Sequence, residues 1–442
     1  GAFRMKIPEA YGGLGFSQLN YNRAVSLVGS WCGSTAIWLS GHQSIGIPTP
    51  LKLFGSEAQK KKYLPRVASG ELSAFALTEP EVGSDPARMQ TTAVPDPAGD
   101  GWILNGEKLW CTNGPKADVL IVMACTPEKE IKGRKRKQIS AFIVETSAPG
   151  FEVVHRCDFM GYGGIQSGLL RFKDVKLPKD ALLWEEGQGL KLALITLNTG
   201  RLTLPATNTA VAKQCLQIVR HWAAQRQQWG APIGRHESLA VQVGWIAAHT
   251  FAMEAFCDYV AALADRGDTD IRLEAAMSKL FCSEVVFEIA DRTMQIRGGR
   301  GFETQDSLQA RGDDAWPVER IFREARLNRI VEGTSEILRL FLAREALDPH
   351  LARAGALADP RASTGAKVMS VAKAAPYYAL WFLKRCIPTF GTPDDIPPAL
   401  RGHFRALRRG ARRLARRIFY AMVRHGPSLE HRQGVLGTLV DE

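Results

Sequence analysis

Four segments that combine polar side chains with glycine are the best candidates for chemistry in this 442-residue sequence. They are 78–85 (TEPEVGSD), 109–114 (LWCTNG), 295–299 (QIRGG) and 330–336 (IVEGTSE). Glycine lets the backbone approach a ligand closely, and a carboxylate next to apolar residues is a candidate base, because burial raises its pKa. Glu332, which follows Ile330 and Val331 and precedes Gly333, meets this description.

Other kinds of reaction centre have little support. No HExxH, Walker loop or CxxC pair is present, and 298–301 (GGRG), half of a dinucleotide fingerprint, follows a predicted helix instead of a strand. Seven of the eight cysteines have an apolar neighbour, which indicates reduced, buried thiols. Zinc and disulfide chemistry are therefore not expected, and no metal ligands are assigned.

The composition is that of a globular protein, with 45% hydrophobic and 23% charged residues, and excludes a disordered or fibrous chain. The length predicts about three domains. No apolar run approaches the roughly 18 residues of a membrane-spanning helix, and no signal peptide is recognisable.

The period of the apolar residues changes along the chain. Long-period spacing predicts helices over 20–28 and 36–54, and four short β-branched or aromatic runs predict strands. These runs are 102–104, 119–123, 139–144 and 169–175, and the basic segment 129–137 is interpreted as a solvated hairpin loop. Long amphipathic helices follow over 189–229, 239–266, 271–297 and 335–346.

These patterns predict four parts: a helical domain over 1–70, a β domain over 71–178, a helical bundle over 179–350 and an Arg-rich helical module over 360–442. The fold class is α+β, mainly α. The segment 360–365 is interpreted as a linker, and 305–316 as an inserted loop of unknown role.

Together, the four polar-glycine segments resemble the acyl-CoA dehydrogenase family of flavoproteins, and the resemblance extends to about Leu347. The extra C-terminal module makes the chain most similar to the long-chain and very-long-chain branch. The resemblance implies an N-terminal helical domain, a middle β-barrel domain, a C-terminal four-helix bundle and an additional helical module. Family members have further helical sequence ahead of the segment like 7–9 (IPE), so both terminal parts are expected to be truncated here.

The resemblance implies FAD-dependent introduction of a trans-2 double bond into a fatty acyl-CoA, as in β-oxidation. In this reaction a carboxylate takes the α-proton and flavin N5 takes a hydride from the β-carbon. Glu332 matches the catalytic base, and the position at which some relatives carry the base matches Gly200, which has no carboxylate. The implied substrate-binding residues are Ser84, Asn198, Arg201 and Gly333.

The implied cofactor is FAD, and its binding residues match the motifs. Those expected along the isoalloxazine ring and the pyrophosphate are Phe75, Leu77, Thr78, Ser84, Trp110 and Thr112. Those expected at the adenosine end are Arg226, Trp229, Gln295, Gly298, Gly299, Thr334 and Glu336, several of them reaching the flavin of a neighbouring subunit. Two departures from the family pattern are Trp229, where Phe is usual, and Glu237, where Gln is common.

The implied partners are an acyl-CoA, with a long chain favoured, an electron-transfer flavoprotein and further copies of the chain in a homodimer or homotetramer. The expected location is the bacterial cytoplasm or the mitochondrial matrix. A peripheral position on the inner membrane is an additional option. Two alternatives stay open: an acyl-CoA oxidase that uses O₂, and a flavin-binding assembly or DNA-binding relative without turnover.

The segment 401–424 concentrates positive charge, with nine arginines and no acidic residue. Its apolar residues form a helical stripe that begins at Phe404 and Leu407. The first interpretation is a bundle helix with solvated arginines; the second is a helix that lies on an anionic membrane surface. Nucleic-acid binding is not expected, since aromatic residues are sparse and no base-reading motif is present.

Overall fold

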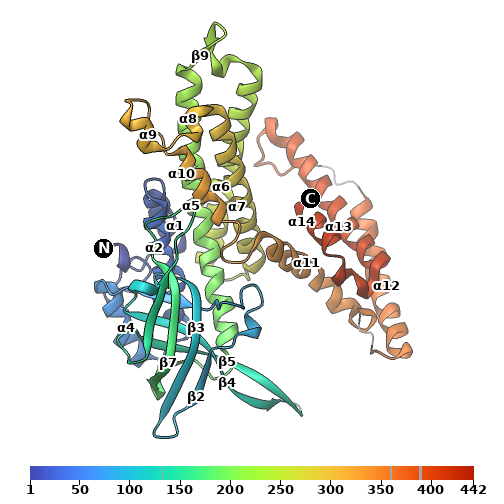
Figure 1. The fold of residues 1–442 in the computed structure, drawn as a ribbon. Coiled ribbons are helices and arrows are strands. Elements are labelled where there is room, and N and C mark those ends of the chain that lie inside the picture. Colours follow the sequence, from blue (N-terminus) through green and yellow to red (C-terminus); the bar gives the residue numbers. More distant parts are fainter. Residues whose placement is uncertain (132, 359–360, 388–390) are drawn as a thin grey trace. The chain divides into compact units, whose positions relative to one another are not determined.

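The computed structural model describes residues 1–131, 133–358, 361–387 and 391–442 (Figure 1). The contacts within the chain divide it into two compact units, Gly1–Thr334 and Ser335–Glu442. The four predicted domains are finer than this division, and their boundaries stay a prediction. No helix in the described ranges combines the length and the apolar character needed to cross a bilayer.

The first unit begins with short helices. They are η1 Ala2–Arg4, η2 Glu9–Tyr11, α1 Gln18–Gly29, α2 Gly33–Ser40, η3 Gly41–Ile45, α3 Pro48–Phe54 and α4 Glu57–Ser69. The prediction of one helix over 36–54 is wrong, because η3 is a π-helical turn and the backbone becomes extended at Gly46, just before Pro48. Ser56 and Gln59 form a capping box that starts α4.

One sheet of eight strands is found in the described part of the chain. The strands are β1 Ser73–Ala76, β2 Thr92–Pro95, β3 Gly101–Thr112, β4 Val119–Ile131, β5 Arg134–Glu145, β6 Phe151–Arg156, β7 Ser167–Pro178 and β8 Leu182–Leu183. Their order is β6-β7-β3-β2-β4-β5-β8, and β1 pairs in parallel with β4. All four predicted strand segments lie within these strands.

The central strand β4 supplies two hydrophobic cores at once. Ile121 and Met123 point to a core shared with α3, α4 and the start of α5. Leu120 and Val122 point to the other face, where they pack with residues of β3, β5 and β7. Because both faces are covered, the strand is an unbroken apolar run and does not alternate with polar residues.

Two smaller predictions about this unit need correction. The basic segment 129–137 is mostly paired strand, since the β4–β5 ladder continues to Ile131 and Arg134. The expectation of buried thiols is correct for five cysteines, but Cys32 and Cys386 are exposed and Cys157 is intermediate. Local apolar neighbours do not show which side of a helix faces the core.

A bundle of helices completes the first unit. It contains α5 Gly189–Gln225, α6 Glu237–Arg266, α7 Arg272–Arg297 and α10 Val318–Leu327, whose apolar stripes share one core. The start of α5 packs on the sheet through Leu192 and Ala193. Its other end leads into the hairpin β9 Gln227–Gln228 and β10 Ala231–Pro232, far from the sheet (Figure 1).

The second unit is helical: α11 Ser335–Ala358, α12 Thr364–Cys386, α13 Arg401–His425 and α14 Gln433–Asp441. Trp381 of α12 and Phe419 of α13 lie in its aromatic core, with ring centroids 5.7 Å apart. Of the predicted linker 360–365, Pro360 lies outside the described residues, and α12 already begins at Thr364 with Ser363 as its N-cap.

A buried ion pair joins the segment after β1 to β3. The Lys108 Nζ lies 2.8 Å from Glu79 Oε1, and both side chains are almost fully buried. Glu79 also accepts hydrogen bonds from the backbone N–H groups of Gln90 and Thr91. Burial alone would raise the pKa of Glu79, but Lys108 and these hydrogen bonds outweigh burial and lower it.

We predict that Lys108→Met lowers the free energy of unfolding by about 3–5 kcal/mol, because it leaves a buried carboxylate without its cation. Urea unfolding measures the change. The double variant Lys108→Met/Glu79→Gln should recover most of the loss, since no uncompensated charge is left. Wild-type stability of the single variant would contradict the importance of the pair.

Candidate active site

Glu332 lies on a strained turn between α10 and α11. Its backbone φ is 56°, and that of Gly333 is 96°, so two consecutive residues adopt positive φ values. A positive φ is uncommon for a residue with a side chain and costs free energy unless the surroundings stabilise it. Such strain in a polar residue is typical of functional sites.

Two cations hold the backbone of this turn. Arg201 of α5 donates from Nε to the carbonyl oxygen of Glu332 at 3.3 Å. Lys279 of α7 donates from Nζ to the carbonyl oxygen of Gly333 at 2.8 Å, and its side chain is fully buried. The turn is therefore fixed from two helices of the bundle.

The Glu332 carboxylate faces Gly200 of α5. A Cβ atom added to Gly200 would lie 2.5 Å from Oε1 and 2.6 Å from Oε2, so only glycine leaves space for the carboxylate. Among the described residues, Oε2 is buried and has no hydrogen-bond partner. Burial raises the pKa of Glu332 to about 7, although Lys279 and Arg201 each lower it in part.

Arg201 also binds the side chain of Asn198, because its Nη1 donates a hydrogen bond to the Asn198 Oδ1 at 3.1 Å. Both were expected to contact substrate. The structure places them one turn apart on α5, beside the Glu332 turn, and gives Arg201 a structural contact that the sequence did not reveal.

Trp110 and Thr112 lie at the end of β3. Trp110 has a φ of 52° and is 57% exposed, so it is not a core aromatic in a regular strand. Asn113 follows in the left-handed region with a φ of 67° and is fully buried; its Nδ2 donates to the carbonyl of Trp38 at 3.1 Å. This turn presents a large flat indole away from the core.

The segment 78–85 begins beside the segment 109–114. The carbonyl of Leu77 accepts a hydrogen bond from Lys108 Nζ at 3.1 Å, and the carbonyl of Thr78 accepts one from the Leu109 N–H at 2.9 Å. Phe75 packs in the core next to this segment, whereas Ser84 is exposed on the following loop. The structure thus brings 75–78 and 108–112 together.

Most of the residues expected at the adenosine end of FAD lie at the other end of α5. A cavity of about 530 Å³ is lined there by Arg226, Gly298 and Gly299, among others. Trp229, at the tip of the hairpin, is 94% exposed with a φ of 55°. Gln295 is exposed on α7 and does not line this cavity.

The residues around Glu332 and the residues that line the 530 Å³ cavity are too far apart to bind one small chemical group together. Gly200 and the C-terminus of α5 are separated by about 37 Å along the helix at 1.5 Å per residue. Thr334 adjoins the Glu332 turn, and Glu336 belongs to the first turn of α11 in the second unit.

These residues fit FAD. The exposed indole of Trp110 offers a stacking surface, and the pinned segment 77–78 lies beside it. At the far cavity, Gly298 has a φ of 62° and ψ of −139°, a conformation open to glycine, and arginines suit phosphate groups. Bound FAD would thus be held by 75–78, Trp110 and Thr112.

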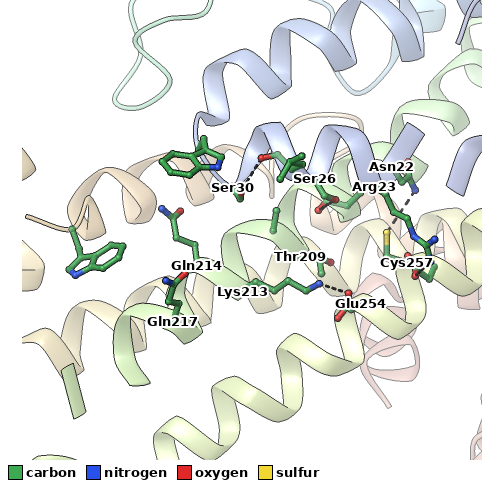
Figure 2. Close-up of a pocket in the computed structure, with 16 residues that line it drawn as sticks. Asn22, Arg23, Ser26, Ser30, Thr209, Lys213, Gln214, Gln217, Glu254 and Cys257 are labelled. Atoms are coloured by element: carbon green, nitrogen blue, oxygen red, sulfur yellow. Dashed lines mark hydrogen bonds and ion pairs between the residues drawn. The ribbon is translucent and has the colours of Figure 1, made fainter. Parts of the chain in front are cut away.

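A second cavity, of about 570 Å³, lies between α1, α5 and α6 (Figure 2). Figure 2 shows Lys213 paired with Glu254 and Asn22 directed toward Cys257. None of the residues expected to act in chemistry lines this cavity. It is therefore distinct from the site that the motifs predicted.

Comparison with known proteins identifies the class of fold and site. The family models for the N-terminal, middle and C-terminal domains of acyl-CoA dehydrogenases match residues 1–71, 74–175 and 187–347. The chain belongs to the acyl-CoA dehydrogenase family. It is an oxidoreductase and a flavoprotein with FAD as its cofactor.

Particular relatives fit the predicted branch. The chain is 50% identical to "Probable acyl-CoA dehydrogenase FadE10" of Mycobacterium tuberculosis, over all of this chain and 68% of the relative. It is 39% identical to the mitochondrial very long-chain specific acyl-CoA dehydrogenase of Mus musculus, over 78% of this chain and 51% of that protein. A solved acyl-CoA dehydrogenase complexed with FAD from Bacillus anthracis has 30% identity and a TM-score of 0.81, covering 100% of this chain and 72% of that one.

Two lysines that matter here were missed from the sequence. Lys279 shares the buried stripe of α7 with Ala275, Cys282 and Val286, and Lys108 lies on the buried side of β3. A lysine at a position that the period assigns to the core is the signal that could have identified Lys279. For Lys108 there is no comparable signal. Buried residues do not alternate regularly along β3, and its partner Glu79 is distant in sequence.

We predict that Gly200→Ala lowers kcat/KM more than tenfold while bound FAD is retained, because the new methyl group displaces the Glu332 carboxylate. Steady-state kinetics and the visible spectrum measure both effects. Gly244→Ala, on α6 with open space around it, is the matched control. Normal turnover of Gly200→Ala would show that the carboxylate does not need this position.

Proposed function

We propose that this protein introduces an α,β double bond into a fatty acyl-CoA, with Glu332 as the base. The observation that supports this most directly is the Glu332 carboxylate itself, buried, without a hydrogen-bond partner on Oε2, and with its pKa raised to about 7. A carboxylate in this state is a stronger base than one in water. The α-proton of a thioester is weakly acidic and needs such a base.

Each residue of the site has a defined task in this proposal. The Glu332 carboxylate accepts the α-proton, Gly200 leaves room for that carboxylate, and Gly333 lets the acyl chain approach the backbone closely. Arg201 and Lys279 hold the turn, so that the carboxylate keeps one position during proton transfer. Trp110 and the segment 75–78 bind the flavin. Bound FAD supplies the acceptor for the hydride from the β-carbon.

Substrate and partners are part of the proposal. A long acyl chain is favoured because a relative named for very long-chain substrates is 39% identical. The electrons must leave the flavin after each turnover, and we assign them to an electron-transfer flavoprotein, within β-oxidation in a bacterial cytoplasm. The FadE10 relative from Mycobacterium tuberculosis supports the bacterial assignment.

The first test is an anaerobic titration with acyl-CoAs from short to long, monitored by the visible spectrum of the flavin. Bleaching by long chains would support the reaction and define the chain length. Rapid recolouring in air would instead indicate an oxidase. Bound flavin that no acyl-CoA bleaches would contradict the proposal and favour a binding role.

We predict that kcat/KM rises with pH and levels off above an apparent pKa near 7. The sign follows from the base: Glu332 accepts a proton only when ionised, so activity is lost as the pH falls below 7. Glu332→Gln should keep FAD and slow bleaching by about 10²- to 10⁴-fold. Glu185→Gln, an exposed carboxylate before α5, is the control. Substantial bleaching by Glu332→Gln would place the base elsewhere.

The basic helix α13 supports a further proposal, contact with an anionic membrane surface. Part of the apolar stripe packs inward, since Ala421 and Met422 contact the core around Leu429 and Leu436, whereas Leu407 is 73% exposed. The first interpretation of this helix is therefore met only in its C-terminal part. Arg408, Arg412 and Arg416 donate to backbone carbonyls at and after the end of α12. The exposed face that remains carries Arg405, Arg409, Arg413 and Arg424. This face is therefore the surface that could meet lipid headgroups.

We predict that replacing these four arginines with glutamine weakens binding to vesicles containing phosphatidylglycerol by at least a hundredfold. Each basic residue near an anionic surface contributes about 1 kcal/mol. Vesicle sedimentation measures binding, and phosphatidylcholine vesicles are the control. Unchanged binding to the anionic vesicles would exclude this face as the contact.

A further inference from the structure

The segment 303–316 is folded and attached to the far cavity. It contains the helix α9 Gln305–Ala310, so its interpretation as a loop is wrong. Thr304 caps α9 by accepting from the N–H of Ser307, and Leu308 is fully buried beneath it. The segment follows α8 Gly299–Phe302, so it begins at the rim of the cavity.

Two residues of this segment line the cavity directly, Glu303 and Arg311. The other walls come from the end of α5, the β9–β10 hairpin with the turn after it, the start of α6, and the end of α7 with the start of α8. Arg311 is held by Glu303, with Nε···Oε1 at 3.0 Å and Nη2···Oε2 at 2.8 Å. This two-point pairing fixes the plane of the guanidinium group.

Two aspartates of the segment hold arginines of the opposite wall. Asp313 Oδ2 lies 2.7 Å from Arg300 Nε and 2.9 Å from Arg311 Nη2, so it joins both. Asp314 binds Arg297 twice, through its Oδ2 to Nη1 at 3.1 Å and through its carbonyl to Nη2 at 2.7 Å. Each contact occupies part of a guanidinium group, which has five N–H donors.

The indole of Trp222 lies among three of these guanidinium groups. The distances from the ring centroid to Cζ are 4.6 Å for Arg297, 5.3 Å for Arg300 and 5.7 Å for Arg226. The Arg297 side chain is fully buried, and its Nε has no partner among the described residues. Like charges this close repel each other, so the aspartates are needed to keep them in place.

We propose that 303–316 is a binding element for the nucleotide half of FAD, in which Arg311 lines the pocket and Asp313 and Asp314 position Arg300 and Arg297. Arginines with fixed planes bind phosphate oxygens through two N–H groups at once. The inference rests on the proposed function and on the expectation from the family resemblance that Arg226, Gly298 and Gly299, which line this cavity, reach the flavin of a neighbouring subunit.

Positioning and simple electrostatics predict opposite results for one variant. If the aspartates only lowered the positive charge, Asp313→Asn would strengthen the binding of a phosphate-bearing ligand. If they position the arginines, the same variant releases Arg300 and Arg311 and weakens binding. The direction of the change therefore decides between the two.

The experiment measures the FAD dissociation constant of the holoenzyme by dilution, from the fluorescence of released flavin. We expect about tenfold weaker FAD binding for Asp313→Asn and for Arg311→Gln, the loss of one charge-assisted contact. Gln309→Ala, exposed on α9, is the matched control.

A double-variant cycle tests whether Asp313 acts through Arg300. Asp313→Asn should weaken FAD binding less in an Arg300→Ala background than in the wild type. Equal effects in both backgrounds, or unchanged or tighter binding by Asp313→Asn, would overturn the inference.

Arg226→Ala, measured in parallel, separates this inference from the proposed function. Loss of FAD from Arg226→Ala with normal binding by the segment variants would refute the role of 303–316 alone. Normal FAD binding by Arg226→Ala as well would show that the cavity is not a flavin site and would refute the inference, whereas the proposed reaction at Glu332 is tested separately by the titration with acyl-CoAs.

Discussion

The constraint on which the rest of this structure depends is a buried carboxylate that must stay unpaired. Any hydrogen-bond donor close to the Glu332 carboxylate would stabilise the ionised form and weaken it as a base. The turn is held through its backbone carbonyls, and Oε2 of the Glu332 side chain has no hydrogen-bond partner among the described residues. Arg201 and Lys279 both reach carbonyl oxygens of the turn, and Gly200 contributes only empty space.

This arrangement requires costly features elsewhere. A lysine in the core of α7 is unfavourable unless its ammonium group has a partner, and a glutamate with a positive φ is strained. Each compensates the other, since the turn offers the carbonyl that Lys279 needs and Lys279 stabilises the turn. Lys108 repeats the same solution beside the segment proposed to bind the flavin, where its ammonium group contacts the Leu77 carbonyl and Glu79.

The long helix α5 determines how the two halves of the site are divided. Its start packs on the sheet near the reactive turn, and its end carries the hairpin and the arginine-lined cavity (Figure 1). The helix keeps these places about 37 Å apart, which is consistent with the expectation that a neighbouring subunit supplies part of the flavin site.

The sequence by itself determined the elements and the chemistry that is local in the chain. Periods of apolar residues located most helices and strands, and the motif around Glu332 predicted a base, because a carboxylate next to apolar residues is a candidate for burial and a raised pKa. Tertiary structure alone decided what surrounds that base. Gly200, Arg201 and Lys279 meet Glu332 from two helices distant in sequence, and Asp313 and Asp314 meet Arg300 and Arg297 across a cavity. Periodicity shows which side of an element is buried, but packing, which depends on the whole chain, decides which groups meet there.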